Sequence, residues 1–319
     1  MHNEKNLIVS HAPFWHDGDS LAARHYNIFL AALIPVIAGC LIYGVPAVGV
    51  VSLAVSSAII WEVIINKISR RPVSVGDGNA ALIGLLLAML MPATMPWWVV
   101  VLGTFIAVVI AKEIFGGLGG NPFSPVLISM AMLMVSWPQF FDFNQMLADY
   151  DTGFDMAYPL ASLKYFGSES IAGFSTSDLL MGRQSGGIGA TFGLGIVIGG
   201  VYLMLRGFIR WEIVLSFLAG IFITAWLFQF SEGGDYAGPL FHLFAGYTLV
   251  GAFFLATEDS SSPVNFVPML IYGAAGGMMT VLIRNLGVYI DGVVFAVLII
   301  NLVNPLVDKI RPKAMGKVV

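Results

Sequence analysis

The sequence predicts an all-α integral membrane protein, and three observations carry that prediction. Of the 319 residues, 58% are hydrophobic and 11% are charged, with a mean hydropathy of +0.86, whereas soluble domains carry about twice that share of charge. The apolar residues come in blocks long enough to cross a roughly 30 Å hydrocarbon layer as helices. These blocks are too continuous for the alternating pattern of a membrane barrel. Peripheral and secreted soluble proteins are therefore excluded.

The apolar blocks predict about ten transmembrane helices in two five-helix repeats. The third block, AALIGLLLAMLM, is too short for a full crossing and precedes PATMP, and the eighth ends in the polar run TEDSSSP. Both are therefore expected to be broken helices. The expected helices span residues 27–43, 46–65, 80–91, 97–115, 124–137, 191–205, 212–229, 240–256, 266–283 and 288–304.

Five parts are expected along the chain. They are a cytoplasmic N-terminal tail, the first repeat, an external acidic loop, the second repeat and a cytoplasmic C-terminal tail, at residues 1–26, 27–137, 138–190, 191–304 and 305–319. The first tail lacks the basic start and apolar stretch of a signal peptide, so we expect it to be retained. The external loop is either a docking surface or a solvated connector, and its acidic residues are Asp142, Asp149, Asp151, Asp155, Glu169 and Asp178.

Basic residues divide unequally between the two sides of the membrane when ten crossings start from a cytoplasmic N-terminus. Only Lys164, Arg183 and Arg284 then lie outside. This division agrees with the positive-inside rule, and a shift by one helix destroys it. We therefore expect a multi-pass protein of the bacterial inner membrane with both termini in the cytoplasm. The basic residues on the inner side are Lys5, Arg24, Lys67, Arg70, Arg71, Lys112, Arg206, Arg210, Lys309, Arg311, Lys313 and Lys317.

An internal repeat relates the two halves of the chain. Residues 112–123 align with residues 284–295 at a constant offset of 172 residues, and Pro96 aligns with Pro263 when a five-residue shift is allowed. Each unit has five helices, an odd number, so the two units are expected to be inverted relative to each other in the membrane.

Carboxylates near the helix breaks are the candidates for an ion path. In inverted repeats the broken helices meet near the middle of the membrane and hold an ion or a small polar solute. Asp77 and Glu258 lie at the two breaks, and Asp291 precedes the last helix. Helix capping or an interfacial position explains these three equally well. Glu62 and Glu113 lie beside cytoplasmic lysines, and we interpret them as interfacial charges.

The residues present exclude several kinds of chemistry. Cys40 is the single cysteine, so disulfides and Cys-ligated clusters cannot be built from this chain alone. His25 and His242 lie at opposite membrane faces and cannot ligate one haem. No nucleotide-binding motif lies on a strand–turn–helix unit, so nucleotide hydrolysis and direct NADH binding are not expected. We expect neither a metal site nor a nucleic-acid partner.

A glycine-rich segment, GGIGAT, ends at Thr191, where the external loop enters the sixth helix. From spacing alone, Thr191 is a helix N-cap preceded by flexible glycines. Nearly the whole chain, however, resembles the D subunit of the Rnf ion-translocating electron-transport complex, which is related to the B subunit of the sodium-pumping NADH:quinone reductase. The segments that carry the resemblance are GDGNAALIGLLLAMLMP, FGGLGGNPFSPVLIS, GIGATFGLGIVIGGVYL, ATEDSSSPV and DGVVFAVLIINLVNPLVDKIRP.

The resemblance implies that FMN is joined through its phosphate to the hydroxyl of Thr191. Gly187 and Gly189 are expected to let the backbone approach this cofactor, and a second, non-covalent flavin such as riboflavin is allowed. Two positions depart from the family. The hydroxyl residue that often precedes the threonine is replaced by Ile188 or Gly187, and residues 258–259 are Glu-Asp where the family usually has Asp-Pro.

The implied function is that of a membrane subunit of an ion-translocating oxidoreductase, which couples electron transfer between ferredoxin and NAD to movement of Na⁺ or H⁺. Such a subunit has no complete activity alone. The implied partners are an external flavoprotein, membrane subunits with an iron–sulfur centre, and cytoplasmic subunits that handle ferredoxin and NAD. The alternative is a stand-alone transporter or channel for an ion or small polar solute, without redox chemistry. Flavin content separates the two interpretations.

Overall fold

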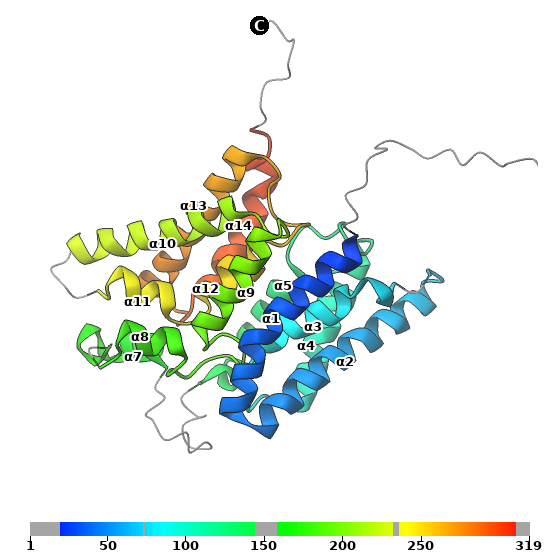
Figure 1. Cartoon of the computed structure of the whole chain (residues 1–319), viewed down its shortest axis with the longest axis horizontal. Coiled ribbons are helices and arrows are strands. Elements are labelled where there is room, and N and C mark those ends of the chain that lie inside the picture. Colours follow the sequence, from blue (N-terminus) through cyan, green and yellow to red (C-terminus); the bar gives the residue numbers. More distant parts are fainter. Residues whose placement is uncertain (1–19, 73, 144–157, 172, 232–235, 311–319) are drawn as a thin grey trace, which may run out of the picture.

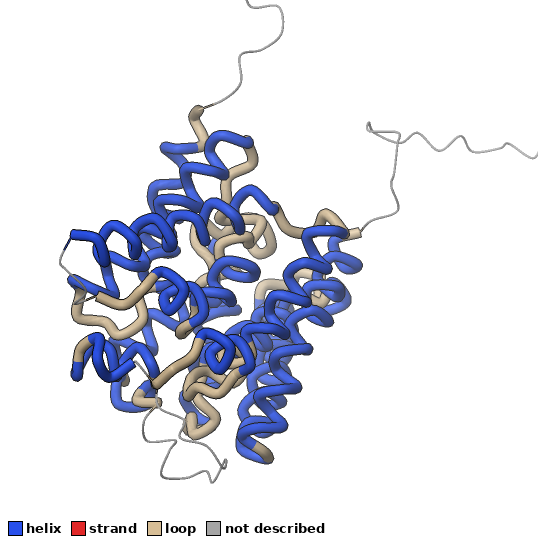
Figure 2. Tube along the Cα trace, turned by 60° about the vertical axis from the view of Figure 1, so that its left-hand side comes forward, coloured by secondary structure: helices blue, strands red, loops and turns tan. Residues whose placement is uncertain are grey.

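A computed structural model describes residues 20–72, 74–143, 158–171, 173–231 and 236–310, and within these ranges every regular element is a helix (Figure 2). The main helices of the first half are α1 (Leu21–Tyr43), α2 (Val45–Ile68), α3 (Asn79–Leu90), α4 (Trp97–Phe105) and α5 (Pro125–Ser136). Those of the second half are α9 (Gly193–Leu205), α10 (Trp211–Ser231), α11 (Pro239–Phe244), α12 (Thr248–Val250), α13 (Phe266–Leu286) and α14 (Val293–Val307).

Several helical segments of the described chain are long and apolar enough to cross a membrane. There are five of them, and they span residues 21–43, 45–68, 97–115, 211–231 and 266–286. The third combines α4, a π-helical turn η2 (Ile106–Ile110) and a 3-10 turn η3 (Glu113–Phe115). The prediction of an all-helical, multi-pass membrane protein is confirmed. The short third helix is also confirmed, because α3 has 12 residues and is therefore about 18 Å long.

The first helix begins earlier than the sequence predicts. The hydroxyl of Ser20 accepts a 3.1 Å hydrogen bond from the backbone N–H of Ala23 and caps the start of α1 at Leu21. The predicted tail at residues 1–26 is therefore too long, and its residues 1–19 lie outside the described ranges. At the other end, α14 continues to Val307, beyond the predicted boundary at residue 304.

The eighth predicted helix is interrupted, but earlier than expected. After α11 the chain turns at Gly246, which has a φ of +65°, and continues through α12 into the π-helical turn η6 (Gly251–Leu255). Arg284 explains this break, because its guanidinium donates hydrogen bonds to the carbonyls of His242 and Ala245. A second break follows over residues 256–265, where the polar run was predicted.

The predicted external loop at residues 138–190 contains short helices where it is described. They are η4 (Pro138–Phe141), α7 (Pro159–Phe166), η5 (Ser168–Ile171) and α8 (Thr176–Met181). Proline at the first position starts α7, and the Ser175 hydroxyl caps α8 by accepting from the N–H of Asp178. Asp149, Asp151 and Asp155 lie outside the described residues.

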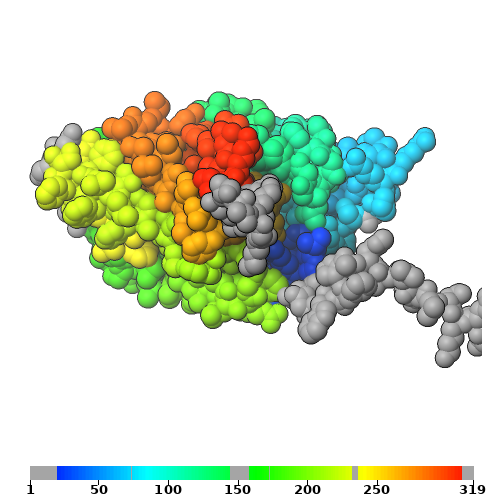
Figure 3. All heavy atoms as spheres, turned by 90° about the horizontal axis from the view of Figure 1, so that it is seen from above, coloured from blue at the N-terminus to red at the C-terminus, as the bar shows by residue number. Residues whose placement is uncertain are grey.

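The two halves of the chain lie side by side (Figures 1 and 3). Helices α1 to α5 form one side and α9 to α14 the other, and they meet where α1 packs on α9 and α5 packs on α14. The segment with α7 and α8 lies at the end of the molecule opposite the C-terminus (Figure 1).

The two ends of the molecule differ in the residues that they gather. At one end, Arg24 bonds to the Phe208 carbonyl and forms an ion pair with Asp259, while Asp308 accepts a hydrogen bond from Asn265. We call this the Arg24 end. At the other, the Lys164 ammonium donates to two carbonyls just before α14, and we call this the Lys164 end.

Candidate functional site

The end of α3 is the point where three distant segments meet. The N–H groups of Ile188 and Gly189 donate to the carbonyls of Met91 and Met89 over 2.9 and 3.0 Å. The phenol of Tyr247 donates to the Leu90 carbonyl over 2.7 Å. A helix that stops inside a membrane leaves carbonyls without partners, and these three hydrogen bonds satisfy them.

The glycines before Thr191 are required by this packing. A Cβ on Gly187 would lie 2.5 Å from the Met89 carbonyl oxygen, and one on Gly189 would lie 2.5 Å from the Met89 side chain. The two glycines therefore permit the close approach of this segment to α3. Gly187 also lines the small space beside Thr191, and the approach of Gly187 and Gly189 to a cofactor stays a prediction.

Thr191 lies inside the protein, at the end of the glycine-rich segment. Its residue is 1% exposed, and its Oγ1 is buried without a hydrogen-bond partner among the described residues. The N-cap position of α9 is Phe192, with no side-chain capping bond. The N-cap of α9 is therefore one residue later than the spacing predicts, and the glycine-rich segment before it packs inward onto α3.

The described residues leave no open space beside the Thr191 hydroxyl. The space beside Thr191, lined by Tyr158, Gln184, Gly186 and Tyr247 among others, has no room for a water molecule. A phosphoryl group is larger, so an ester at Thr191 would require the residues that line this space to move. Attachment of FMN at Thr191 stays a prediction of the resemblance.

A larger pocket, of about 470 Å³, lies next to Thr191 at the Lys164 end. It shares Tyr158 and Tyr247 with the small space beside Thr191. Aromatic side chains dominate its walls, and we call it the aromatic pocket. Its aromatic residues are Phe141, Phe143, Tyr158, Tyr165, Tyr247 and Tyr289.

Asp291, one of the predicted ion-path residues, forms a fully paired buried contact with Arg284. Its Oδ1 accepts from the Arg284 guanidinium over 2.9 Å and from the Val293 N–H, and its Oδ2 accepts from the Tyr247 N–H over 2.7 Å. Arg284 also donates to the hydroxyl of Thr248. With every partner in place, this pair favours a structural role for Asp291.

A second buried ion pair joins Glu62 to Lys112. The sequence predicted Glu62 to be an interfacial charge. Glu62 is 0% exposed and its Oε1 lies 2.6 Å from the Nζ of Lys112, which is 2% exposed. Ser74 donates to the same oxygen over 3.0 Å. Lys112 aligns with Arg284 in the internal repeat, so each half places one paired cation at the end of its fourth long segment. That alignment was the available signal for the burial of Lys112.

Asp77 caps a helix at the Arg24 end. Its Oδ1 accepts from the N–H of Asn79, the first residue of α3, over 2.8 Å, and its carbonyl lies 3.0 Å from Nδ1 of His25. These contacts favour the capping interpretation that the sequence left open.

Glu258 is held by neutral donors from both halves. The Asn121 amide, in the loop after η3, donates to Glu258 Oε1 over 3.2 Å, and the hydroxyls of Ser260 and Ser261 donate over 2.9 and 3.1 Å. No cation of the described chain forms an ion pair with it, because Arg24 pairs with the neighbouring Asp259. Glu258 lies in the connection before α13, and burial raises its pKa.

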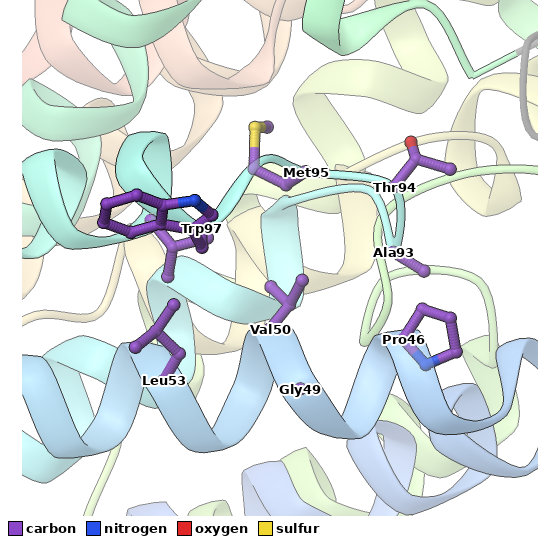
Figure 4. A pocket seen from close by; sticks show the side chains of 9 residues that line it. Pro46, Gly49, Val50, Leu53, Ala93, Thr94, Met95 and Trp97 are labelled. Carbon is purple, nitrogen blue, oxygen red and sulfur yellow. The ribbon is translucent and has the colours of Figure 1, made fainter.

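A pocket of about 370 Å³ opens beside Glu258. We call it the Glu258 pocket. Polar groups and aromatic side chains share its lining, which includes His25, Asn79, Phe253, Phe254 and Glu258. By contrast, the groove of about 650 Å³ between α2 and the α3–α4 connection (Figure 4) is apolar apart from Thr94, and Trp97 on its edge is exposed. That groove offers no titratable group.

Comparison with known proteins identifies the family of this chain. The model of the NQR2, RnfD, RnfE family matches residues 8–316. The D subunit of a Na(+)-translocating ferredoxin:NAD(+) oxidoreductase complex of Acetobacterium woodii is 36% identical, covering 96% of this chain and 94% of its own. The D subunit of a proton-translocating ferredoxin:NAD(+) oxidoreductase complex of Clostridium ljungdahlii is 33% identical, covering 96% and 95%. The D subunit of an ion-translocating oxidoreductase complex of Aliivibrio salmonicida is 31% identical, covering 97% and 98%. The chain belongs to the NQR2, RnfD, RnfE family.

Proposed function

We propose that this chain is a membrane subunit of an ion-translocating ferredoxin:NAD⁺ oxidoreductase complex. In this proposal it carries a flavin that passes electrons between partner subunits, and it couples that transfer to movement of a cation. The family and the names of its relatives support the proposal. The same names speak against a stand-alone transporter or channel.

The observation that carries the coupling role is the contact between Asn121 and Glu258. It joins the loop after the first π-helical turn, η2, to the connection after the second, η6. π-Helical turns occur often at functional sites. Asn121 lies 11 residues after the end of η2, and Glu258 lies three residues after the end of η6. A shift of one half relative to the other would therefore change the donors around Glu258.

The chemistry of Glu258 suits a monovalent cation. Carboxylate and hydroxyl oxygens are the ligands that hard cations take, and a carboxylate whose pKa is raised by burial takes up a proton readily. Two of the relatives named above belong to a sodium-translocating and a proton-translocating complex. We therefore propose Glu258 as the cation-binding group, with Na⁺ or H⁺ as the coupling ion. Asp77 supports its surroundings, because it contacts His25 and Asn79, which line the Glu258 pocket.

We also propose the arrangement in the membrane. The Arg24 end faces the cytoplasm of a bacterial cell, with both termini there, and the Lys164 end faces outward. The two halves are inverted repeats, which is supported by the equivalent placement of Lys112 and Arg284. An external flavoprotein and iron–sulfur subunits are the proposed partners.

Two pockets are available for flavins in this proposal. Thr191, beside the aromatic pocket, is the proposed attachment point of FMN at the external end, and the Glu258 pocket is the proposed place of a second, non-covalent flavin such as riboflavin. A bound flavin supplies one- and two-electron chemistry. This chain supplies the aromatic walls and holds the carboxylate beside the second pocket, so that a change of charge in the pocket alters the cation affinity of Glu258.

The test uses the whole complex in liposomes. Reduced ferredoxin and NAD⁺ are supplied on the side of the Arg24 end, and Na⁺ uptake and pH change inside are followed together with NADH formation. We expect ion movement only while NAD⁺ is being reduced. Ion movement by this chain without ferredoxin or NAD⁺ would instead support the transporter interpretation.

A further inference from the structure

We propose that the Glu258 site is built to bind Na⁺ rather than a proton, with serine hydroxyls as further ligands and asparagines of both halves as positioning residues. This inference rests on the proposed function, in which Glu258 binds the coupling cation. A proton needs a single oxygen, whereas Na⁺, like other hard cations, takes several oxygen ligands at once. The hydroxyls around Glu258 therefore bear on which of the two ions the site takes.

Three serine hydroxyls gather on the carboxylate of Glu258. Ser260 and Ser261 donate to its two oxygens over 2.9 and 3.1 Å, and Ser124, from the first half of the chain, is a third donor. Ser124 occupies the N-cap position of α5, where a serine hydroxyl ordinarily caps the helix, yet its side chain makes no capping bond. Its hydroxyl therefore serves the carboxylate and not the helix.

Two asparagines hold the serines that follow Glu258 in the chain. The Asn121 amide donates to the Ser260 hydroxyl over 2.6 Å as well as to Glu258 itself. Asn304 of α14 donates to the Ser261 carbonyl over 2.8 Å, which fixes the backbone from which that hydroxyl extends. These two serines are thus held from opposite halves of the chain.

A third asparagine, Asn301, holds Ser124 and lies three residues before Asn304, on the same side of α14. Its side-chain oxygen accepts from the Ser124 N–H over 3.3 Å, and its nitrogen donates to the Tyr272 hydroxyl over 2.5 Å and to the Val297 carbonyl over 3.2 Å. Asn301 and Tyr272 are both 1% exposed. This buried bridge ties Ser124 of the first half to α13 and α14 of the second.

Supporting partners of this kind are expected behind the ligands of a metal ion. They orient the ligands before the ion arrives, and loss of one partner typically lowers metal affinity about 10- to 100-fold. A carboxylate that only carried a proton would need no set of fixed hydroxyls. The charge also fits, because one carboxylate among neutral hydroxyls balances one monovalent cation.

The test uses the whole complex in liposomes, driven by reduced ferredoxin and NAD⁺. The rate of radioactive Na⁺ uptake is measured against the concentration of NaCl at constant pH, and the pH inside is followed in parallel. Ser124→Ala removes one proposed ligand, and Tyr272→Phe removes the support of the bridge behind it. Tyr202→Phe is the matched control, because its hydroxyl also bonds to an asparagine, Asn27, but outside this network.

We expect Ser124→Ala and Tyr272→Phe each to raise the half-saturating Na⁺ concentration on the order of tenfold, and Tyr202→Phe to leave it unchanged. Because Tyr272 acts through Ser124, the double variant should bind Na⁺ no more weakly than Ser124→Ala alone. Asn301→Ala breaks the same bridge and replaces Tyr272→Phe if that variant assembles poorly.

An unchanged half-saturating Na⁺ concentration in both Ser124→Ala and Tyr272→Phe overturns the proposal, since the hydroxyls then only satisfy a buried carboxylate. A wild-type complex that moves protons and no Na⁺ also overturns it. The proposed function fails separately. If Glu258→Gln keeps the wild-type number of ions moved per NADH, Glu258 does not bind the coupling ion, whichever ion that is.

Discussion

The phenol of Tyr247 donates a 2.7 Å hydrogen bond to the carbonyl of Leu90, the last residue of α3. This bond connects the break in the second half of the chain to the end of the short helix in the first. On its other side the same tyrosine ring forms part of the aromatic pocket. One side chain therefore both satisfies a carbonyl at the end of α3 and shapes the aromatic pocket.

Tyr247→Phe should destabilise the folded chain while keeping the aromatic ring in the pocket wall. The buried Leu90 carbonyl loses its partner, which costs about 1 to 3 kcal/mol. Thermal denaturation of the purified complex checks this. Flavin retention should change little, because the ring stays. A melting temperature equal to that of wild type would show that the Leu90 carbonyl finds another donor.

Gly187→Ala should prevent correct packing of the glycine-rich segment. The added methyl would lie 2.5 Å from the Met89 carbonyl oxygen, a backbone atom that cannot move aside freely. Gly49→Ala is the matched control, since a Cβ there meets nothing within 4 Å and alanine favours a helix. Yield of assembled complex in detergent is the measurement. Normal yield from Gly187→Ala would contradict the packing role.

Asp291→Asn should reduce stability and assembly. It leaves the Arg284 charge buried without its counter-charge, and breaking such a pair costs about 3 to 5 kcal/mol. Size-exclusion profiles and thermal denaturation of the variant complex check this expectation. If assembly and stability stay normal and only ion movement is lost, Asp291 belongs to the ion path after all.

The proposed orientation predicts opposite labelling of two exposed positions. In a Cys40→Ser background, Glu169→Cys in η5 should react with a membrane-impermeant thiol reagent added outside intact cells. Lys309→Cys, after α14, should react only after the membrane is opened. Labelling of both from one side would contradict the placement of the Arg24 and Lys164 ends on opposite faces.

Much of the fold follows from the sequence alone, for a physical reason. A single segment that crosses a membrane can satisfy its own backbone hydrogen bonds only as a helix, so apolar blocks must become helices there. The helices and the break after α3 could therefore be predicted. The position of the break in the eighth helix could not. It depends on Arg284, far along the chain from Gly246, which competes for the carbonyls that would continue the helix.

The candidate site was predicted less completely. Sequence pattern could place Glu258 at a break, but burial of Thr191 depends on the fit of Gly187 and Gly189 against Met89, which spacing does not encode. The pairing of Glu62 with Lys112 was missed for a similar reason. A charged residue near a helix end is predicted to be interfacial unless it is known that a neighbouring helix covers it.

Ion movement by the Glu258→Gln complex tests the central claim most directly. The whole complex in liposomes is driven by reduced ferredoxin and NAD⁺, and ions moved per NADH formed are compared with those of wild type and of Asp259→Asn. Asp259 is the control because its carboxylate already pairs with Arg24. The account predicts that Glu258→Gln keeps its flavin and its assembly but lowers the ion ratio to that of an uncoupled complex, while Asp259→Asn keeps the wild-type ratio. An unchanged ratio in Glu258→Gln would contradict the account.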